Sequence, residues 1–144
     1  MAAIEILKVS KLLPVLTQDL QDRYQVHELD ALGDQSVLQR VRAIVGGGES
    51  RMDAALFDRC PQAKVVSCFG VGYDGVDTQA ALERGIVVGH TPDVLNDEVA
   101  DLGLGLMLCI ARQIPQADQY VRSGQWAKAP FALQRKLTGA RLGL

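Results

Sequence analysis

Three glycines at residues 70, 72 and 75 are the part of this sequence best suited to bind a charged ligand. They form the motif Gly70-Val71-Gly72-Tyr73-Asp74-Gly75, a GxGxxG pattern directly after the apolar run 63–69. Such a motif binds a dinucleotide when its turn opens a helix whose N-terminus meets the pyrophosphate. The next strand must then end in Asp or Glu, which binds the ribose hydroxyls. The residues that follow the motif therefore indicate whether it binds a dinucleotide.

The residues downstream of the motif argue against a nucleotide. Residues 76–84 can form a helix, with Asp77 or Thr78 near its start and Gly85 as its stop. The next apolar run, 86–89, is followed by His-Thr-Pro, so no acid stands at its tip. We therefore favour a glycine bend whose bare backbone N–H groups bind a small anion such as a carboxylate. An ordinary tight turn between strand and helix explains the same glycines, and nucleotide binding remains a third hypothesis.

Composition limits the remaining possibilities. The 144 residues are about one domain's worth, and 48% hydrophobic with 22% charged residues is typical of a folded globular chain. A net charge of −2 without a basic cluster argues against nucleic acid and membrane surfaces as partners. No run reaches the roughly 20 apolar residues of a membrane span. The three cysteines lack metal-ligand spacing, which favours no metal site and a reduced, cytoplasmic protein; they are Cys60, Cys68 and Cys109.

Apolar strands alternate with helical segments along the first 92 residues. The runs are apolar without alternation, which is typical of a parallel sheet covered on both faces. We predict an α/β fold, a flavodoxin-like doubly wound parallel sheet of five strands that ends near Pro92. The predicted strands are 4–9, 24–29, 42–45, 64–68 and 86–88, and the predicted helices are 14–24, 34–41, 52–59 and 76–84. If the strands before Gly46–Gly48 and Gly70–Gly75 are neighbours, both glycine loops line one crevice at the carboxyl edge of the sheet.

After Pro92 the sequence changes character. A long helix is predicted to begin near Asp97, and from Leu102 to Ile110 it is apolar around its whole circumference. A helix of this kind must be covered on every side. A missing domain or a second subunit can supply that cover; a central core helix of the same domain is the alternative. Residues 137–144 resemble the first residues of another strand, so we expect the sequence to stop at the start of a further domain.

Several segments, in order, resemble the D-isomer-specific 2-hydroxyacid dehydrogenase family. They are residues 65–77, 83–86, 91–95, 98–102, 120–126 and 137–139. The Thr-Pro-Asp-Val-Leu segment is most similar to the branch of glyoxylate/hydroxypyruvate and hydroxyphenylpyruvate reductases. The resemblance implies that residues 1–92 are a substrate domain and that 93–136 are an interdomain and dimerisation helix and loop. Residues 137–144 are then the first strand of a nucleotide-binding Rossmann domain that is absent here.

The resemblance also implies a reaction for the complete enzyme. It is the reduction of a small 2-oxo acid to a D-2-hydroxy acid by NADPH or NADH, in a protein that forms a homodimer. The family's catalytic Arg, Glu and His lie further along the polypeptide, so no catalytic residue is assigned and the chain alone is expected to be inactive. The alternative is a free-standing flavodoxin-like module that binds a small anion or regulates through it.

Five positions match the family's binding positions. Val71 and Gly72 are expected to hold the substrate carboxylate through their backbone N–H groups. Gly47 and Gly48 match a loop that approaches the substrate from the other side. Val99 matches a position near the nicotinamide of NADP or NAD.

The two histidines of the sequence do not match the family's catalytic position. They are His27 and His90. His90 stands where the family often has Asn, and we interpret it as a structural residue.

Overall fold

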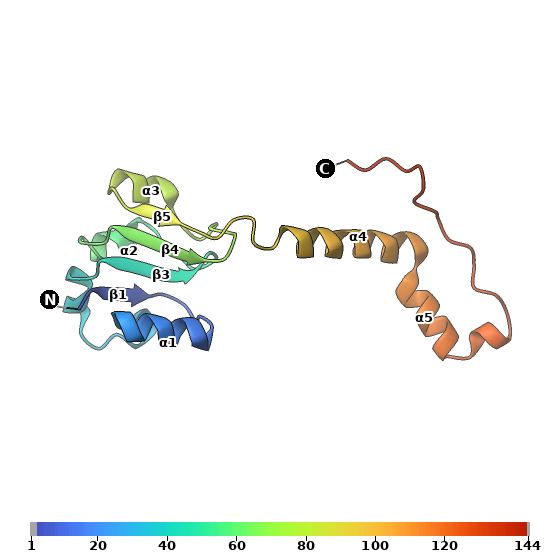
Figure 1. The fold of residues 1–144 in the computed structure, drawn as a ribbon, viewed down its shortest axis with the longest axis horizontal. Coiled ribbons are helices and arrows are strands. Elements are labelled where there is room, and N and C mark those ends of the chain that lie inside the picture. The colour runs from blue at the N-terminus through green and yellow to red at the C-terminus, as the bar shows by residue number, and fades with distance from the viewer. Residues whose placement is uncertain (1–2, 144) are drawn as a thin grey trace. The chain divides into compact units, whose positions relative to one another are not determined.

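The computed structural model describes residues 3–143 (Figure 1). Strands and helices alternate from residue 5 to residue 89, and the elements described after residue 89 are helices. In chain order the elements are β1 Glu5–Lys8, α1 Pro14–Arg23, β2 Gln25–Glu28, η1 Leu29–Ala31, η2 Gln35–Gln39, β3 Ala43–Gly47, α2 Ala54–Arg59, β4 Val65–Phe69, α3 Thr78–Glu83, β5 Val87–Gly89, α4 Asn96–Arg112, α5 Ile114–Arg122 and η3 Gln125–Ala127.

The five strands form one parallel sheet in the order β2-β1-β3-β4-β5 (Figure 1). This is the flavodoxin-like order, so the predicted fold is confirmed. Its middle is held by the pairing of β3 with β4, in which Ile44 lies opposite Val66 and Gly47 lies opposite Phe69. Because all strands run in the same direction, their carboxyl ends meet at one edge of the sheet. That edge carries both glycine loops.

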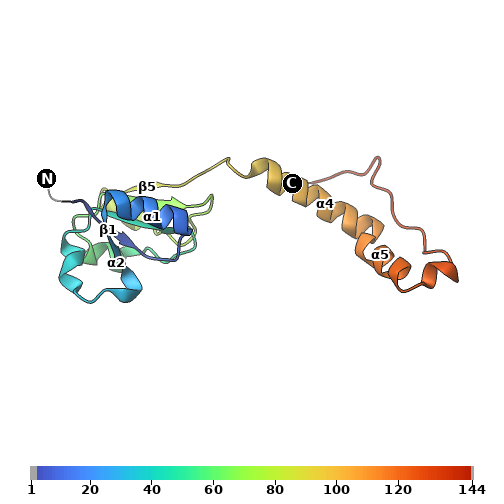
Figure 2. The same cartoon turned by 60° about the horizontal axis from the view of Figure 1, so that its bottom comes forward.

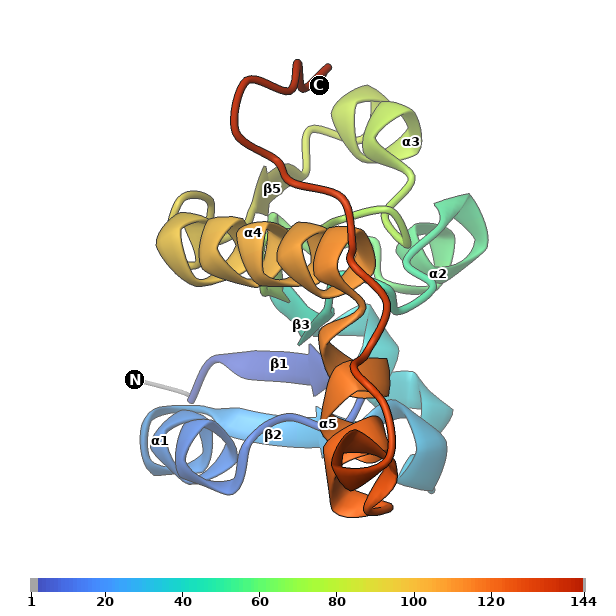
Figure 3. The ribbon, with the colours of Figure 1, turned by 90° about the vertical axis from the view of Figure 1, so that its right-hand side faces the viewer.

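Helices cover the two faces of the sheet. Figure 3 shows α1 on one side of the strands and α2 and α3 on the other. Side chains of α1 pack with Ile6 and Val45 in the smaller core cluster. The larger cluster joins Ile44 and Phe57 with residues of α2 and α3. The core thus extends from the first strand to the fifth.

The chain separates into two compact units, Met1–Val94 (unit 1) and Leu95–Leu144 (unit 2). In unit 2, α4 and α5 are consecutive helices (Figure 2). They are separated at Gln113, which has a left-handed backbone with φ 49°. No described residue of unit 2 is buried. The functional assignment of residues 1–92, 93–136 and 137–144 to separate domains stays a prediction.

Residues 137–143 contain a turn, with the N–H of Ala140 bonded to the carbonyl of Leu137 at 2.8 Å, and no strand. A strand needs a neighbour for its backbone groups, so the first strand predicted here also stays a prediction, and its last residue, Leu144, lies outside the described residues. Within residues 3–143, no helix has the length and apolar character needed to span a membrane.

Candidate functional site

The two glycine loops lie against each other at the carboxyl ends of β3 and β4. The N–H of Gly75 donates to the carbonyl of Gly48 at 2.8 Å, and the N–H of Met52 donates to the carbonyl of Gly75 at 2.9 Å. A side chain on Gly48 would collide with the carbonyl of Gly72. The two strands are thus neighbours, as the sequence analysis required, and their loops touch backbone to backbone.

The exposed part of the second loop presents two bare amides. Val71 is 42% exposed and Gly72 is also exposed. Neither of their backbone N–H groups donates to an acceptor in the part of the chain that the structure describes. The bend begins at Gly70, whose φ of 133° is strained for any residue with a side chain. We call residues 70–72 the glycine bend. Its two neighbouring free donors at the surface are suited to an anion.

The carbonyl groups of the glycine bend are used within the protein. The carbonyl of Gly70 accepts from the N–H of Thr91 at 2.9 Å. The carbonyl of Val71 accepts from Nδ1 of His90 at 2.8 Å. The free donors and the occupied acceptors therefore belong to the same short segment, which gives the exposed side of the bend a positive character.

Gly47 and Gly48 are buried beneath this bend, and each forms hydrogen bonds within the protein. The N–H of Gly47 donates to Oγ of Ser10 at 2.9 Å, and the carbonyl of Gly48 is bonded to Gly75. Both glycines support the bend, and their contact with a substrate stays a prediction. The sequence did not single out Ser10. This residue follows β1, and β1 lies next to β3 in the sheet. Knowledge of the strand order would therefore have placed Ser10 beside Gly47.

The geometry does not fit a dinucleotide at this loop. The helix after the motif, α3, has six residues and begins at Thr78. Its N-terminus already holds an anion, because the carboxylate of Asp77 accepts from the N–H of Ala80 at 2.9 Å. The next strand ends at Gly89 and is followed by His90, without an acid. A pyrophosphate would meet the Asp77 carboxylate where it needs free N–H groups.

Val99 and the cysteines singled out in the sequence belong to unit 2 or to the core of unit 1. Val99 belongs to unit 2, on α4, and its side chain is 63% exposed. Cys68 lies at 2% exposure on β4, and burial raises the pKa of its thiol, so it remains a protonated core residue. Burial raises the pKa of Cys60 in the same way. Among residues 3–143 no group of three His, Cys, Asp or Glu side chains could hold a metal ion.

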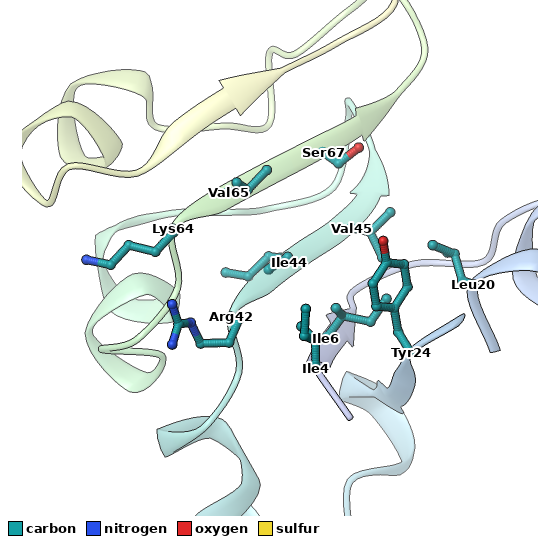
Figure 4. Close-up of a pocket in the computed structure, with 11 residues that line it drawn as sticks. Ile4, Ile6, Leu20, Tyr24, Arg42, Ile44, Val45, Lys64, Val65 and Ser67 are labelled. Carbon is teal, nitrogen blue, oxygen red and sulfur yellow. The ribbon is translucent and has the colours of Figure 1, made fainter. Parts of the chain in front are cut away.

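An apolar pocket of about 600 Å³ opens elsewhere, on the face of the sheet beside α1 (Figure 4). Its walls include Ile6, Val45 and Val65, and Arg42 and Lys64 stand at the amino ends of the strands. Ligands of parallel sheets bind beyond the carboxyl ends of the strands. We therefore assign the candidate site to the glycine bend and not to this pocket.

Sequence comparison relates this chain to known proteins. The family model described as "D-isomer specific 2-hydroxyacid dehydrogenase, catalytic domain" matches residues 6–135. The chain is 40% identical to hydroxyphenylpyruvate reductase of Plectranthus scutellarioides, with all of this chain and 48% of the relative aligned. It is 36% identical to glyoxylate/hydroxypyruvate reductase A of Arabidopsis thaliana, again over 100% of this chain and 48% of the relative.

Solved structures show the same relationship. A 2-hydroxyacid dehydrogenase from Ketogulonicigenium vulgare has a TM-score of 0.82 and 40% identity, over 94% of this chain and 45% of the other. The NADPH-dependent glyoxylate/hydroxypyruvate reductase of Sinorhizobium meliloti, in complex with NADP and malonate, has a TM-score of 0.75 and 36% identity, over 92% and 42%. The chain thus spans about half the length of the relatives it matches.

Proposed function

The chain belongs to the D-isomer-specific 2-hydroxyacid dehydrogenase family, and we propose that it is the part of such an enzyme that binds the carboxylate of a small 2-oxo acid. The complete enzyme reduces a 2-oxo acid of the glyoxylate or hydroxypyruvate class to a D-2-hydroxy acid. The names of the relatives support this substrate class, since they are reductases of glyoxylate, hydroxypyruvate and hydroxyphenylpyruvate.

The observation that carries the proposal is the pair of free N–H groups on Val71 and Gly72. Each can donate a charge-assisted hydrogen bond to a carboxylate oxygen, and such bonds are about twice as strong as bonds between neutral groups. Gly72 leaves the backbone open to the ligand, because it has no side chain that would cover its N–H. Two donors from adjacent residues hold the carboxylate end, so the 2-oxo group has a defined direction.

The reduction also needs NADP or NAD, whose nicotinamide supplies the hydride when it is bound. The Asp77 carboxylate on the N-terminus of α3 supports placing the dinucleotide away from the glycine bend, because a pyrophosphate would need the same N–H groups. We place the cofactor on polypeptide that these residues do not include, with Val99 of α4 as a contact near the nicotinamide. The 144-residue chain is then inactive by itself, since it lacks the hydride donor's site.

The exposed helix α4 supports a homodimer in the complete enzyme. Leu104 and Leu106 are 55% and 54% exposed, and Ile110 is 80% exposed. Apolar side chains all around a helix are stable in water only when other protein covers them. We propose that α4 contributes to the interface between two subunits. Sedimentation of the Leu104→Glu variant tests this proposal: its self-association should be lost, and unchanged association would contradict it.

Two measurements on the 144-residue chain test the proposed function. In a ¹⁵N NMR titration with glyoxylate, the amide signals of Val71 and Gly72 should shift, because the carboxylate binds there. In an assay with glyoxylate, hydroxypyruvate and NADPH, the chain should show no turnover. Measurable turnover would refute the proposal that this chain binds the substrate but cannot catalyse the reduction by itself. Shifts from NADPH at micromolar concentration would favour the nucleotide hypothesis for the glycine motif.

Gly72→Val is the matched variant for this titration. At residue 72 an added Cβ meets only Oδ2 of Asp74, at 4.0 Å, so the fold can accept a side chain. The valine side chain then covers the approach to the backbone N–H, and binding of the carboxylate should weaken about tenfold or more. Unchanged affinity in a folded Gly72→Val variant would show that the anion binds elsewhere.

A further inference from the structure

The segment directly after β5 is hydrogen-bonded to the glycine bend. The backbone N–H of Thr91 donates to the carbonyl of Gly70 at 2.9 Å. Nδ1 of His90 lies 2.8 Å from the carbonyl oxygen of Val71. A carbonyl oxygen can only accept, so Nδ1 carries the proton and donates. Two consecutive residues thus fix two consecutive carbonyl groups.

Each of these carbonyls shares a peptide group with one of the two free amides. In a planar trans peptide, the C=O of one residue and the N–H of the next point in opposite directions. All peptide bonds that the structure describes are trans. The bond from Thr91 to Gly70 therefore sets the direction of the Val71 N–H, and the bond from His90 to Val71 sets that of the Gly72 N–H.

Side-chain packing at the two glycines does not supply this orientation. An added Cβ at Gly70 would meet no atom within 4 Å, and at Gly72 it would meet only the Asp74 carboxylate, at 4.0 Å. The carbonyl of Gly72 lies against Gly48, but the Val71–Gly72 peptide is a separate group, and between flexible glycines a hydrogen bond to its carbonyl restricts its rotation. The imidazole that makes this bond is itself held, because the ring of Tyr73 packs against its edge with centroids 4.9 Å apart and planes at 69°.

We propose that His90 is a positioning residue of the carboxylate site, whose side chain aims the Gly72 N–H at the carboxylate of a 2-oxo acid. This inference rests on the proposed function, in which that N–H binds the substrate. The same hydrogen bond polarises the Val71–Gly72 peptide group and makes its N–H a better donor. His90 acts through the backbone of Val71 and touches no reacting atom.

Residual dipolar couplings and a glyoxylate titration of the ¹⁵N-labelled 144-residue chain test this role. His90→Ala removes the hydrogen bond, and His90→Asn keeps an N–H donor on a short side chain. His27→Ala is the matched control, because it removes the other histidine, which bonds to Glu5 at 3.0 Å and not to the bend. Glycolaldehyde, which is similar in size and has no carboxylate, is the control ligand.

In His90→Ala, the dipolar coupling of the Gly72 N–H should change and glyoxylate should bind about tenfold more weakly, as expected for a misdirected charge-assisted bond. His90→Asn should restore both values most of the way, and His27→Ala should alter neither. Unchanged Gly72 couplings in His90→Ala overturn the inference, whether or not glyoxylate binds. Equal glyoxylate affinity in the wild type and His90→Ala also overturns it. Absence of any shift at Val71 and Gly72 in the wild type would instead refute the proposed function.

Discussion

Unit 1 and unit 2 use their apolar side chains in opposite ways. In unit 1, Leu7, Ile44 and Val66 are 0% exposed and lie between the sheet and its helices. In unit 2, Leu104 is 55% exposed and Ile110 is 80% exposed, although α4 is the most apolar long helix of the chain. Apolar composition alone therefore does not make a core. A second layer must cover each apolar face, and within residues 3–143 it is unit 1 that contains such a layer.

Two α-helices of unit 1 begin with a side-chain cap, whereas α1 of the same unit begins after Leu13 without one. In unit 1 the carboxylates of Asp53 and Asp77 cap α2 and α3 by accepting from backbone N–H groups at 3.1 Å and 2.9 Å. In unit 2 the N-cap positions of α4 and α5 are Leu95 and Gln113, and neither side chain caps its helix. A capping carboxylate stabilises a helix by about 1 kcal/mol. The short helices α2 and α3 thus have a side-chain cap that the N-cap residues of α1, α4 and α5 do not provide.

Substituting one isoleucine in each unit gives the largest expected contrast. Ile44→Ala should lower the free energy of unfolding by about 2–5 kcal/mol, since it leaves a cavity in the core. Ile110→Ala removes the same atoms from an exposed position and should change stability by less than about 0.5 kcal/mol in the monomer. Urea denaturation followed by circular dichroism measures both. Equal losses in a monomeric sample would show that unit 2 has a core of its own.

Glycine substitutions in the two touching loops give the next largest effect. Gly48→Ala places a methyl group against the carbonyl of Gly72, so the loops must separate, at a cost of about 1–3 kcal/mol. Gly72→Ala has room for its Cβ and should leave stability within about 0.5 kcal/mol. Thermal unfolding of both variants checks the difference. If Gly48→Ala were as stable as Gly72→Ala, the close backbone contact between the loops would be wrong.

Much of unit 1 could be predicted from the sequence because its strands are short, apolar and separated by helices. Every predicted strand in residues 4–88 is present within a few residues. The helix predicted at 34–41 is instead a short 3₁₀ segment, Gln35–Gln39. The reason is local: the Asp34 carboxylate bonds both the N–H and the hydroxyl of Ser36, at 2.9 Å and 2.8 Å. Such a bond from a side chain to the backbone two residues later forms a local turn, which competes with the start of an α-helix.

The candidate site was predictable only in part. Glycine spacing indicates a sharp bend with free N–H groups, and this property belongs to the residues themselves. The contact of Gly48 with Gly72 depends on β3 and β4 being neighbours, and strand order is a long-range property. The bond from His90 to Val71 depends on the path of the chain after β5. No spacing in the sequence encodes it, which is why His90 was interpreted only as a structural residue.

Substitutions at the two glycines of α4 test the same comparison between the units, with a smaller expected change in stability. An added Cβ at Gly103 or Gly105 would meet nothing within 4 Å in this chain. Each Gly→Ala substitution should therefore stabilise α4 of the monomer by about 1 kcal/mol, which circular dichroism measures as helix content. In the proposed dimer the glycines permit close approach of another backbone, so Gly103→Ala should weaken self-association in sedimentation. If the helix content of Gly103→Ala rose while its self-association stayed unchanged, Gly103 would not belong to the interface.

The smallest expected effect is the acid sensitivity of unit 1. The Glu5 carboxylate accepts from Nε of Arg40 at 2.7 Å and lies 3.0 Å from Nε2 of His27. The hydrogen bond from Arg40 is the main cause that lowers the pKa of Glu5 below its ordinary value of 4.5. A carboxyl group with a lowered folded-state pKa contributes stability above that ordinary value and loses it as the pH falls through the folded-state pKa.

Between neutral pH and about pH 5 the contribution of Glu5 should therefore be constant, and below pH 4.5 it should decline. Glu5→Gln removes the titrating group, so the difference in stability between wild type and variant should shrink as the pH is lowered from 5 to 3. The amide signals of β1 in NMR spectra report this loss of stability as the pH falls. The amide signals of α5, which lies in unit 2, serve as an internal comparison. A difference that stays constant over this range would show that Glu5 titrates equally in the folded and unfolded chain. Arg40 and His27 would then stabilise β1 without depending on the Glu5 charge.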